Sequence, residues 1–410
     1  MGKVLLSAYF ASLSPLALLR AIPGSIAQGL IWGLLALGVY ITYKLLDFAD
    51  LSVDGSFATG GAVAVMLIRG NMNPWLSLLF AFAAGMIAVP CDKVTLGMMI
   101  EELYHSSGCN HILYQNSLTA FDIVEFGTPE QIQKYMDAYM ETGWPLCSLS
   151  ISEPGAGSDN RNMSCTAKKQ DDGTYRLNGQ KTWVTMGAKL PYTIVVAKDE
   201  DPSRENDKMS LWMIEMDRQG VSTAGLHKIG QQCIPFCEVY FDDVVLTEED
   251  RVGTPGEGFM MVMKNFEVER ALLVAEQLGL AQAAMEDAVT YANQRIAFNK
   301  PIANFQMTQE KLTEMEIRLQ NTRNMLYKTL WELDNDISVQ LDSALLKRYG
   351  CTECFNVADM ALSIFGGIGY TTEVRVGRIW ADCRGNLFGG GTPEIMAYIA
   401  GRQVAKKYRA

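Results

Sequence analysis

The charged residues of this 410-residue chain are distributed unevenly, which limits what each part can fold into. The chain has 35 Lys and Arg and 46 Asp and Glu, yet only seven of these residues lie within residues 1–91. Residues 21–43 form an uncharged apolar run, long enough for a helix that crosses a bilayer, and residues 71–91 form a second run. We expect residues 1–91 to be an apolar, membrane-spanning helical segment. The alternative is a buried helix of a soluble domain.

Residues 92–410 carry most of the charge and have the composition of a soluble protein. Their net negative charge argues against nucleic-acid binding, which needs a basic surface. The nine cysteines are scattered along the chain, so a reducing compartment is expected rather than a disulfide framework. Cys351 and Cys354 form a single CxxC in a helical stretch without a second pair, and no metal site is expected.

Local patterns divide residues 92–410 into three parts. Residues 92–147 read as helices, with a capping signal at Thr128, Pro129 and Gln131. Residues 148–250 read as a β domain with strands at 209–216 and 237–246, a hairpin turn at Asn178-Gly179 and a charged loop at 198–207. Residues 251–410 show long helical periodicities that predict a helical bundle.

Three motifs occur in this order: SEPGAGSD at 152–159, KTWVT at 181–185, and FGGIGY at 365–370 followed by Glu373, Arg378 and Asp382. Together they resemble the acyl-CoA dehydrogenase family. The likeness is strongest to crotonobetainyl-CoA dehydrogenase, through FEVER at 266–270, YANQRIAF at 291–298 and NMLY at 324–327. The resemblance implies an α+β multidomain fold with a truncated N-terminal helical domain, a β-barrel-like middle domain and a C-terminal four-helix bundle.

The resemblance also implies an FAD site, and the residue types suit it. Small residues of the 152–159 turn let backbone N–H groups approach a pyrophosphate, and Ser152 and Ser158 add hydroxyl groups. Trp183 offers an aromatic face to the isoalloxazine, and Thr185 offers a hydroxyl. Further matches are Arg295, Phe298, Gln306, Gly366 and Gly367, which in the family reach the FAD of a neighbouring subunit, and Thr392 and Glu394. A complete site then needs a homo-oligomer, a dimer or tetramer.

The reaction implied by the resemblance removes an α-proton from an acyl-CoA and needs a carboxylate base. Most of the family places this base before a Gly-Thr pair, where the present chain has Gly390. A minority carries it on the first helix of the bundle, at the position of Glu269. Glu269 shares a helical stripe with Val262, Phe266, Leu273 and Leu280, and desolvation there would raise its pKa. Glu276 lies on the same stripe, and a structural carboxylate paired with a bundle cation is the alternative.

Substrate contacts are expected from Arg270, Ser158 and Gly391, and the Gly390 N–H can polarise the thioester carbonyl. Arg270 can instead form a purely structural ion pair with Glu267. The expected substrate is a short-chain or carnitine-related acyl-CoA, with electron-transfer flavoprotein as the electron acceptor. The enzyme part is expected in the cytoplasm.

Residues 22–89 resemble the start of a bacterial ABC-transporter permease of the branched-chain amino-acid type. This segment supplies too few spans for a translocation path. Two alternatives to the enzyme therefore stay open, namely a permease fragment, or an inactive fusion of permease and dehydrogenase pieces. An inserted N-terminal segment would tether the enzyme to the bacterial inner membrane.

Overall fold

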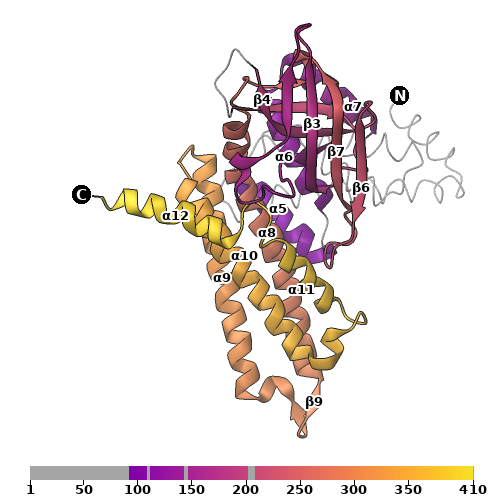
Figure 1. Ribbon diagram of the computed structural model, residues 1–410. Coiled ribbons are helices and arrows are strands. Elements are labelled where there is room, and N and C mark those ends of the chain that lie inside the picture. Colours follow the sequence, from indigo (N-terminus) through magenta and orange to yellow (C-terminus); the bar gives the residue numbers. More distant parts are fainter. Residues whose placement is uncertain (1–91, 109–110, 143–145, 202–207, 410) are drawn as a thin grey trace, which may run out of the picture. The chain divides into compact units, whose positions relative to one another are not determined.

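The computed structural model describes residues 92–108, 111–142, 146–201 and 208–409 (Figure 1). Residues Asp92–Ala410 form a unit of their own. The predicted membrane-spanning runs at 21–43 and 71–91 lie outside the described residues. Within the described part, no helix is both long and apolar enough to span a bilayer.

Three helices open the described chain: α5 (Lys93–Ser107), α6 (His111–Phe126) and α7 (Pro129–Thr142). The Asp92 side chain caps α5 by accepting a hydrogen bond from the Thr95 backbone N–H. At the start of α7 the Thr128 hydroxyl accepts a hydrogen bond from the Gln131 backbone N–H. The Gln131 side-chain oxygen accepts one from the Thr128 backbone N–H. This reciprocal capping box confirms the predicted helix start.

An eight-stranded sheet follows, in the order β6-β7-β3-β2-β4-β5-β8, with β1 paired to β4. Its strands and short 3₁₀ turns are β1 (Cys147–Ser150), η1 (Asn160–Asn162), β2 (Thr166–Lys169), β3 (Tyr175–Thr185), β4 (Tyr192–Glu200), β5 (Met209–Glu215), β6 (Val221–Leu226), β7 (Phe236–Leu246), η2 (Glu248–Asp250) and β8 (Arg251–Val252). Among the described strands the pairing runs as an open path and does not close into a barrel. One face buries an apolar core that includes Trp212 and Tyr175, whose rings pack 4.9 Å apart.

Two local predictions in this domain are wrong. Asn178-Gly179 does not form a hairpin turn but lies inside β3, where the register with β7 shifts between Leu177 and Gly179. Gly179 has φ +146°, and a Cβ there would meet Cys165 at 2.7 Å, so close packing explains this glycine. Lys198–Glu200 belong to β4 instead of a loop, and residues 202–207 of the predicted loop lie outside the described residues.

The C-terminal part is helical, as predicted. It contains α8 (Gly258–Gln294), the two-residue strands β9 (Ile296–Ala297) and β10 (Lys300–Pro301), η3 (Ile302–Asn304), α9 (Gln306–Asp334), α10 (Gln340–Phe365), η4 (Gly366–Tyr370), α11 (Arg375–Gly385) and α12 (Pro393–Lys407). The 37-residue α8 is the central element and packs against α5, α6, α9, α10 and α11. Its middle is buried on all sides, which fits a helix enclosed by neighbours.

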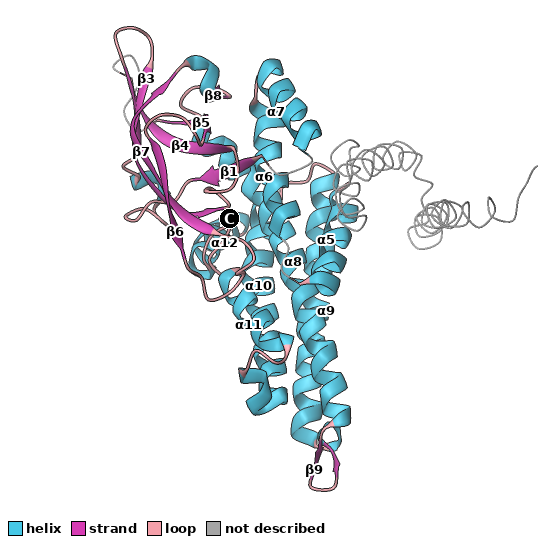
Figure 2. Ribbon diagram, turned by 90° about the vertical axis from the view of Figure 1, so that its right-hand side faces the viewer, coloured by secondary structure: helices cyan, strands magenta, loops and turns pink. Residues whose placement is uncertain are grey.

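The sheet and the helices meet along α6 and α8. β1 packs against α6 and β5 packs against α8, and Figure 2 shows the sheet on one side of α5, α6 and α8. A loop between β6 and β7 reaches α11, where the Gln231 side chain donates to Asn386 at 2.6 Å. The β domain is therefore held against the bundle by buried polar contacts.

Candidate active site

The small-residue turn follows β1 directly and lies at the surface. Glu153 and Ala156 exchange backbone hydrogen bonds of 3.1 Å, which closes the turn. Gly155, Gly157 and Ser158 are exposed, while Ser152 is half-buried. A Cβ added at Gly155 or Gly157 would meet nothing within 4 Å, so the chain's own packing does not require glycine there. The turn thus leaves its backbone open to a ligand.

A buried ion pair fixes this turn to β3. Lys181 Nζ donates to Glu153 Oε1 at 2.8 Å and to the Ile151 carbonyl at 2.9 Å. The Glu153 carboxylate also accepts from the backbone N–H groups of Ser164 and Cys165. Burial would raise the pKa of Glu153, but the bonds from Lys181 and Ser164 outweigh it and hold that pKa below its usual value. The charge is therefore kept on a carboxylate that cannot reach water.

Trp183 projects from a bulge in β3. The register with β7 shifts between Lys181 and Val184, and Trp183 has φ +59°. Its side chain is 60% exposed, although Val184 beside it is buried. A left-handed backbone at a bulky residue costs about 1–3 kcal/mol. The fold thus holds a large aromatic ring outward at an energetic cost, and Thr185 follows it half-buried.

Glu269 and Arg270 lie side by side in α8, and both are buried, at 8% and 5% exposure. Arg270 Nε donates to the carbonyl oxygen of Gly390 at 3.2 Å. A Cβ at Gly390 would also lie 3.7 Å from Lys347 Cε. The structure therefore places the helix that carries Glu269 beside the loop in which a base was expected. Burial raises the pKa of neighbouring Glu267, and the charge of Arg270 opposes that shift.

Glu276 occupies a different environment. It is fully buried, and its Oε1 accepts a 2.9 Å hydrogen bond from Asn386 Nδ2. Asn386 in turn accepts from Gln231, and its backbone carbonyl accepts from Lys347 Nζ at 2.8 Å. Glu276 is thus part of the polar network that joins the sheet to the bundle. This geometry favours Glu269 over Glu276 as the carboxylate of the site.

Sequence reasoning missed a second buried carboxyl group near Glu269. Asp122 of α6 is 2% exposed, and its Oδ1 accepts a 2.6 Å hydrogen bond from Asn265 Nδ2, one turn before Glu269 in α8. Burial raises the pKa of Asp122 to about 7; the Asn265 bond lowers it, and the charges of Glu269 and Glu125 raise it further. The available signal was the position of Asp122 between apolar Phe121 and Ile123 in the second half of α6.

Thr392 and Glu394, two residues predicted to contact FAD, lie at the start of α12. The Thr392 hydroxyl accepts a 3.3 Å hydrogen bond from the Ile395 backbone N–H, which caps α12, and Pro393 follows the cap. Local hydrogen bonds, including one with Thr392, lower the pKa of Glu394, which is exposed. Gly391 has φ +103°, and a Cβ there would meet Met396 Cε at 2.6 Å. Gly391 is therefore required by packing as well as by backbone conformation.

The other predicted cofactor residues lie at the opposite end of the bundle. Arg295 follows α8, Phe298 lies between β9 and β10, and Gln306 begins α9; all three are exposed. Stacking of Phe365 on Tyr291, at 4.4 Å, brings exposed Gly366 and Gly367 to this end. Figure 1 shows β9 at the end of the bundle away from β3. One chain does not bring these residues to the Trp183 site.

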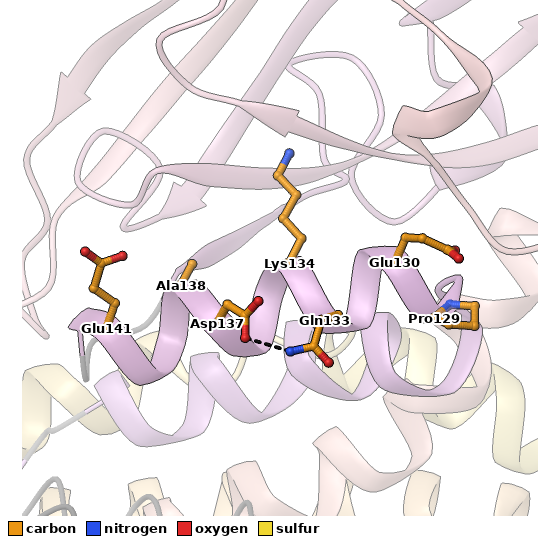
Figure 3. Close-up of a pocket in the computed structure, with 7 residues that line it drawn as sticks. All are labelled: Pro129, Glu130, Gln133, Lys134, Asp137, Ala138 and Glu141. Carbon is orange, nitrogen blue, oxygen red and sulfur yellow. Dashed lines mark hydrogen bonds between the residues drawn. The ribbon is translucent and has the colours of Figure 1, made fainter.

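Two further features lie apart from these residues. A surface hollow follows α7 and is lined by Pro129, Glu130, Gln133, Lys134, Asp137, Ala138 and Glu141, with Gln133 donating to Asp137 (Figure 3). Its polar rim does not suit an acyl chain.

Cys351 and Cys354 are free and buried in α10. The part of the chain that the structure describes holds no group of three or more His, Cys, Asp or Glu able to bind a metal.

Comparison with known proteins agrees with this arrangement. The model of the acyl-CoA dehydrogenase middle domain matches residues 148–244, and that of the acyl-CoA dehydrogenase C-terminal domain matches residues 256–405. A third model, the permease component of a branched-chain amino acid transport system, matches residues 22–89. The predicted permease resemblance therefore has independent support in a segment outside the described residues.

Individual relatives and solved structures are also similar. The Escherichia coli K12 protein named "Probable acyl-CoA dehydrogenase YdiO" is 42% identical over 321 residues, which cover 78% of this chain and 83% of that protein. An acyl-CoA dehydrogenase from Slackia heliotrinireducens is 36% identical with a TM-score of 0.70, over 77% of this chain and 81% of that one. Butyryl-CoA dehydrogenase from Megasphaera elsdenii is 28% identical with a TM-score of 0.69, over 92% and 89%. The chain therefore belongs to the acyl-CoA dehydrogenase family of flavin-dependent oxidoreductases.

Proposed function

We propose that this chain is an FAD-dependent acyl-CoA dehydrogenase, or a reductase in the reverse direction, in which Glu269 is the catalytic base. The single observation that carries the assignment of Glu269 is the Arg270–Gly390 hydrogen bond, because it sets this buried carboxyl beside the loop that lacks one. Glu269 would take the α-proton of the acyl thioester onto its carboxylate. Deprotonation by a positioned carboxylate contributes a factor of about 10²–10⁴ in rate.

The described residues fit a bound FAD. Trp183 offers an exposed flat ring, held outward by a strained backbone. The turn at 152–158 offers backbone N–H groups and two hydroxyls, on a segment fixed by the Glu153–Lys181 pair. Bound FAD supplies the acceptor for the β-hydrogen and its electron pair. We assign Ser152, Ser158, Trp183 and Thr185 to one face of this cofactor, and Thr392 and Glu394 to its edge.

Loop 388–392 and Arg270 would orient the thioester. The Gly390 N–H can donate to the carbonyl oxygen as negative charge develops on it. The Gly390 carbonyl is held by Arg270, which limits rotation of this peptide. We assign substrate contacts to Ser158, Arg270 and Gly391 on the same reasoning. These groups bind and polarise the substrate, while Glu269 moves the proton.

A complete site is proposed to need a second copy of the chain. Phe298 is 90% exposed with φ +50°, so an aromatic ring is again held in solvent by a strained backbone. This pattern supports a contact made in an oligomer, where Arg295, Phe298, Gln306, Gly366 and Gly367 would reach the partner's FAD. A dimer or tetramer satisfies this requirement.

The proposal also covers the substrate, the electron acceptor and the N-terminal segment. A short-chain acyl-CoA is favoured by the likeness to butyryl-CoA dehydrogenase, and a carnitine-related acyl group rests on the FEVER, YANQRIAF and NMLY resemblance alone. Reduced flavin needs an acceptor, for which electron-transfer flavoprotein is proposed. The permease match at 22–89 favours, as a second candidate, a fusion of a permease piece to the enzyme.

Anaerobic titration tests the proposal. The full-length protein is purified, its visible flavin absorbance is recorded, and saturated and unsaturated acyl-CoA thioesters of graded length are added. Loss of the visible flavin absorbance is expected with one class of saturated thioester. A colourless preparation that does not bind added FAD would contradict the enzyme and favour the permease-fragment alternative.

A further inference from the structure

We propose that Asp122 is a positioning residue that controls the protonation of Glu269, through a buried Asp122–Asn265–Glu269 cluster joining α6 to α8. This inference rests on the proposed role of Glu269 as base. It adds the carboxyl group of Asp122. This group touches no reacting atom, but its charge acts on Glu269, which takes the substrate proton.

Helix geometry places the three residues together. Asn265 and Glu269 are four residues apart in α8, so they lie on the same face one turn apart. Asn265 Nδ2 donates to Asp122 Oδ1 at 2.6 Å, which brings the α6 carboxyl onto that face. Exposure is 2% for Asp122 and 8% for each of Asn265 and Glu269. The Asp122 carboxyl group is therefore held against the face of α8 on which Glu269 lies one turn after Asn265.

The charged and titratable groups around Asp122 do not neutralise it. From α8 it faces Glu269, from β1 it faces the Cys147 thiol, and its own helix adds Glu125. Burial raises the pKa of the Cys147 thiol, which keeps that group uncharged at neutral pH. The cation nearest in sequence to Asn265, Lys264, is exposed and forms an ion pair with Glu125. The charge of Glu269 therefore makes ionisation of Asp122 less favourable.

Electrostatic coupling is reciprocal, and this gives Asp122 its effect. The Glu269 charge contributes to raising the pKa of Asp122, so an ionised Asp122 opposes ionisation of Glu269 by the same energy. Below about pH 7 Asp122 holds a proton, and its charge no longer acts on Glu269. Above that pH both groups are ionised, and Glu269 becomes a stronger acceptor for the substrate proton. The pair would titrate in two coupled steps.

A purely structural role is the competing explanation, because the Asn265 bond also ties α6 to α8. Asp122→Asn separates the two roles. It preserves the shape of the side chain and an oxygen that can accept the hydrogen bond from Asn265, while it removes the charge of the carboxylate. Glu125→Gln is the matched control on the same helix, at a side chain that is exposed and ion-paired with Lys264.

The experiment uses the full-length FAD-loaded protein with ¹³C-labelled Asp and Glu carboxyl groups, followed by NMR from pH 4 to pH 9. Glu269→Gln is expected to move the Asp122 titration to lower pH by about one unit, because the Glu269 charge no longer opposes ionisation of Asp122. In wild type the rate of flavin bleaching by acyl-CoA should rise as the pH passes about 7, where Asp122 ionises, and this rise should be absent in Asp122→Asn. Glu125→Gln also removes a charge that raises the pKa of Asp122, but Glu125 is exposed, so it should move the Asp122 titration less than Glu269→Gln does.

The results distinguish the two proposals. If the Asp122 titration does not move in Glu269→Gln, the coupling is absent and Asp122 is only a structural contact. If this shift occurs but Glu269→Gln still bleaches its flavin, the coupling stands and Glu269 loses the role of base. If the shift occurs and Asp122→Asn loses the rise in bleaching rate near pH 7, both proposals hold.

Discussion

Arg270 Nε donates a 3.2 Å hydrogen bond to the carbonyl oxygen of Gly390, although 120 residues separate the two in sequence. Because Arg270 follows Glu269, this bond fixes the position of the candidate base relative to loop 388–392. Gly390 has φ +63°, a conformation that favours glycine, and a Cβ there would lie 3.6 Å from Arg270 Cγ. The loop without a carboxylate and the helix that carries Glu269 therefore lie next to each other.

Glu269→Gln tests the base directly. The substitution keeps the size of the side chain and removes its proton-accepting charge, so FAD should stay bound. The rate of flavin bleaching by acyl-CoA should fall by about 10²–10⁴-fold, as for removal of a general base. Stopped-flow absorbance measures this rate. Glu276→Gln is the matched control from the same helix and should keep fast bleaching; the opposite pattern would transfer the role to Glu276.

Lys181→Met tests whether the buried pair holds the flavin-binding turn. It leaves the Glu153 carboxylate buried without its ammonium partner, and we expect a loss of about 3–5 kcal/mol in the free energy of unfolding, together with weaker FAD binding. The exposed Lys134–Glu215 pair provides the control, since Lys134→Met should lose about 1 kcal/mol or less. Urea unfolding and flavin fluorescence measure the two effects.

The same pair predicts a pH dependence. The folded-state pKa of Glu153 lies below its ordinary value of 4.5, so its stabilising contribution is fully present above that pH. The contribution is lost as pH falls through the folded-state pKa. In wild type, stability should therefore drop below about pH 4.5, and Glu153→Gln should flatten this acid limb. An unchanged acid limb in the variant would show that Glu153 is not responsible.

Trp183→Ala tests the proposed flavin contact. The side chain is 60% exposed, so its removal should change the free energy of unfolding by less than about 1 kcal/mol. Loss of ring stacking of about 0.5–1.5 kcal/mol should raise the Kd for FAD roughly two- to tenfold. Trp331, 55% exposed on α9, offers a comparable exposed tryptophan, and Trp331→Ala should leave the Kd for FAD unchanged. Equal affinities for both variants would remove Trp183 from the site.

Sequence alone could predict the features that depend on neighbouring residues. The cap at Thr128 depends on a spacing of three residues and is confirmed. Glu269 is buried, as its apolar stripe predicts, but Phe266 of that stripe is half-buried and the middle of α8 is enclosed on all sides. Features determined by distant partners were missed. Asp122 is bound by Asn265, 143 residues away. Asp199 in the expected loop is buried because Arg251, 52 residues away, and Ser210 bind it.

The error at Asn178-Gly179 has the same physical origin. The pair has the composition of a tight turn, but pairing with β7 and close packing on Cys165 hold it inside a bulged strand. The FAD site could be predicted from the sequence only in part, for a further reason. The motifs predict Trp183 and Phe298 as site residues, but only the fold reveals that β3, which contains Trp183, and the β9–β10 turn, which contains Phe298, lie far apart in one chain.

Asp122→Asn should stabilise the protein at alkaline pH, which is a test independent of turnover. Asp122 has an ordinary pKa of 3.8 and a folded-state pKa of about 7, so the folded protein binds more protons than the unfolded chain between these values. Stability contributed by protonated Asp122 is therefore present below about pH 4 and is lost as pH rises through about 7. At pH 8 the ionised buried group costs up to about 4 kcal/mol, and the Asn variant should recover part of this, on the order of 2 kcal/mol. Urea unfolding at pH 5.5 and pH 8 measures the difference, with Glu125→Gln as the control. A variant that is equally destabilised at both pH values would mean that the Asn265 contact, and not the charge, determines what Asp122 contributes.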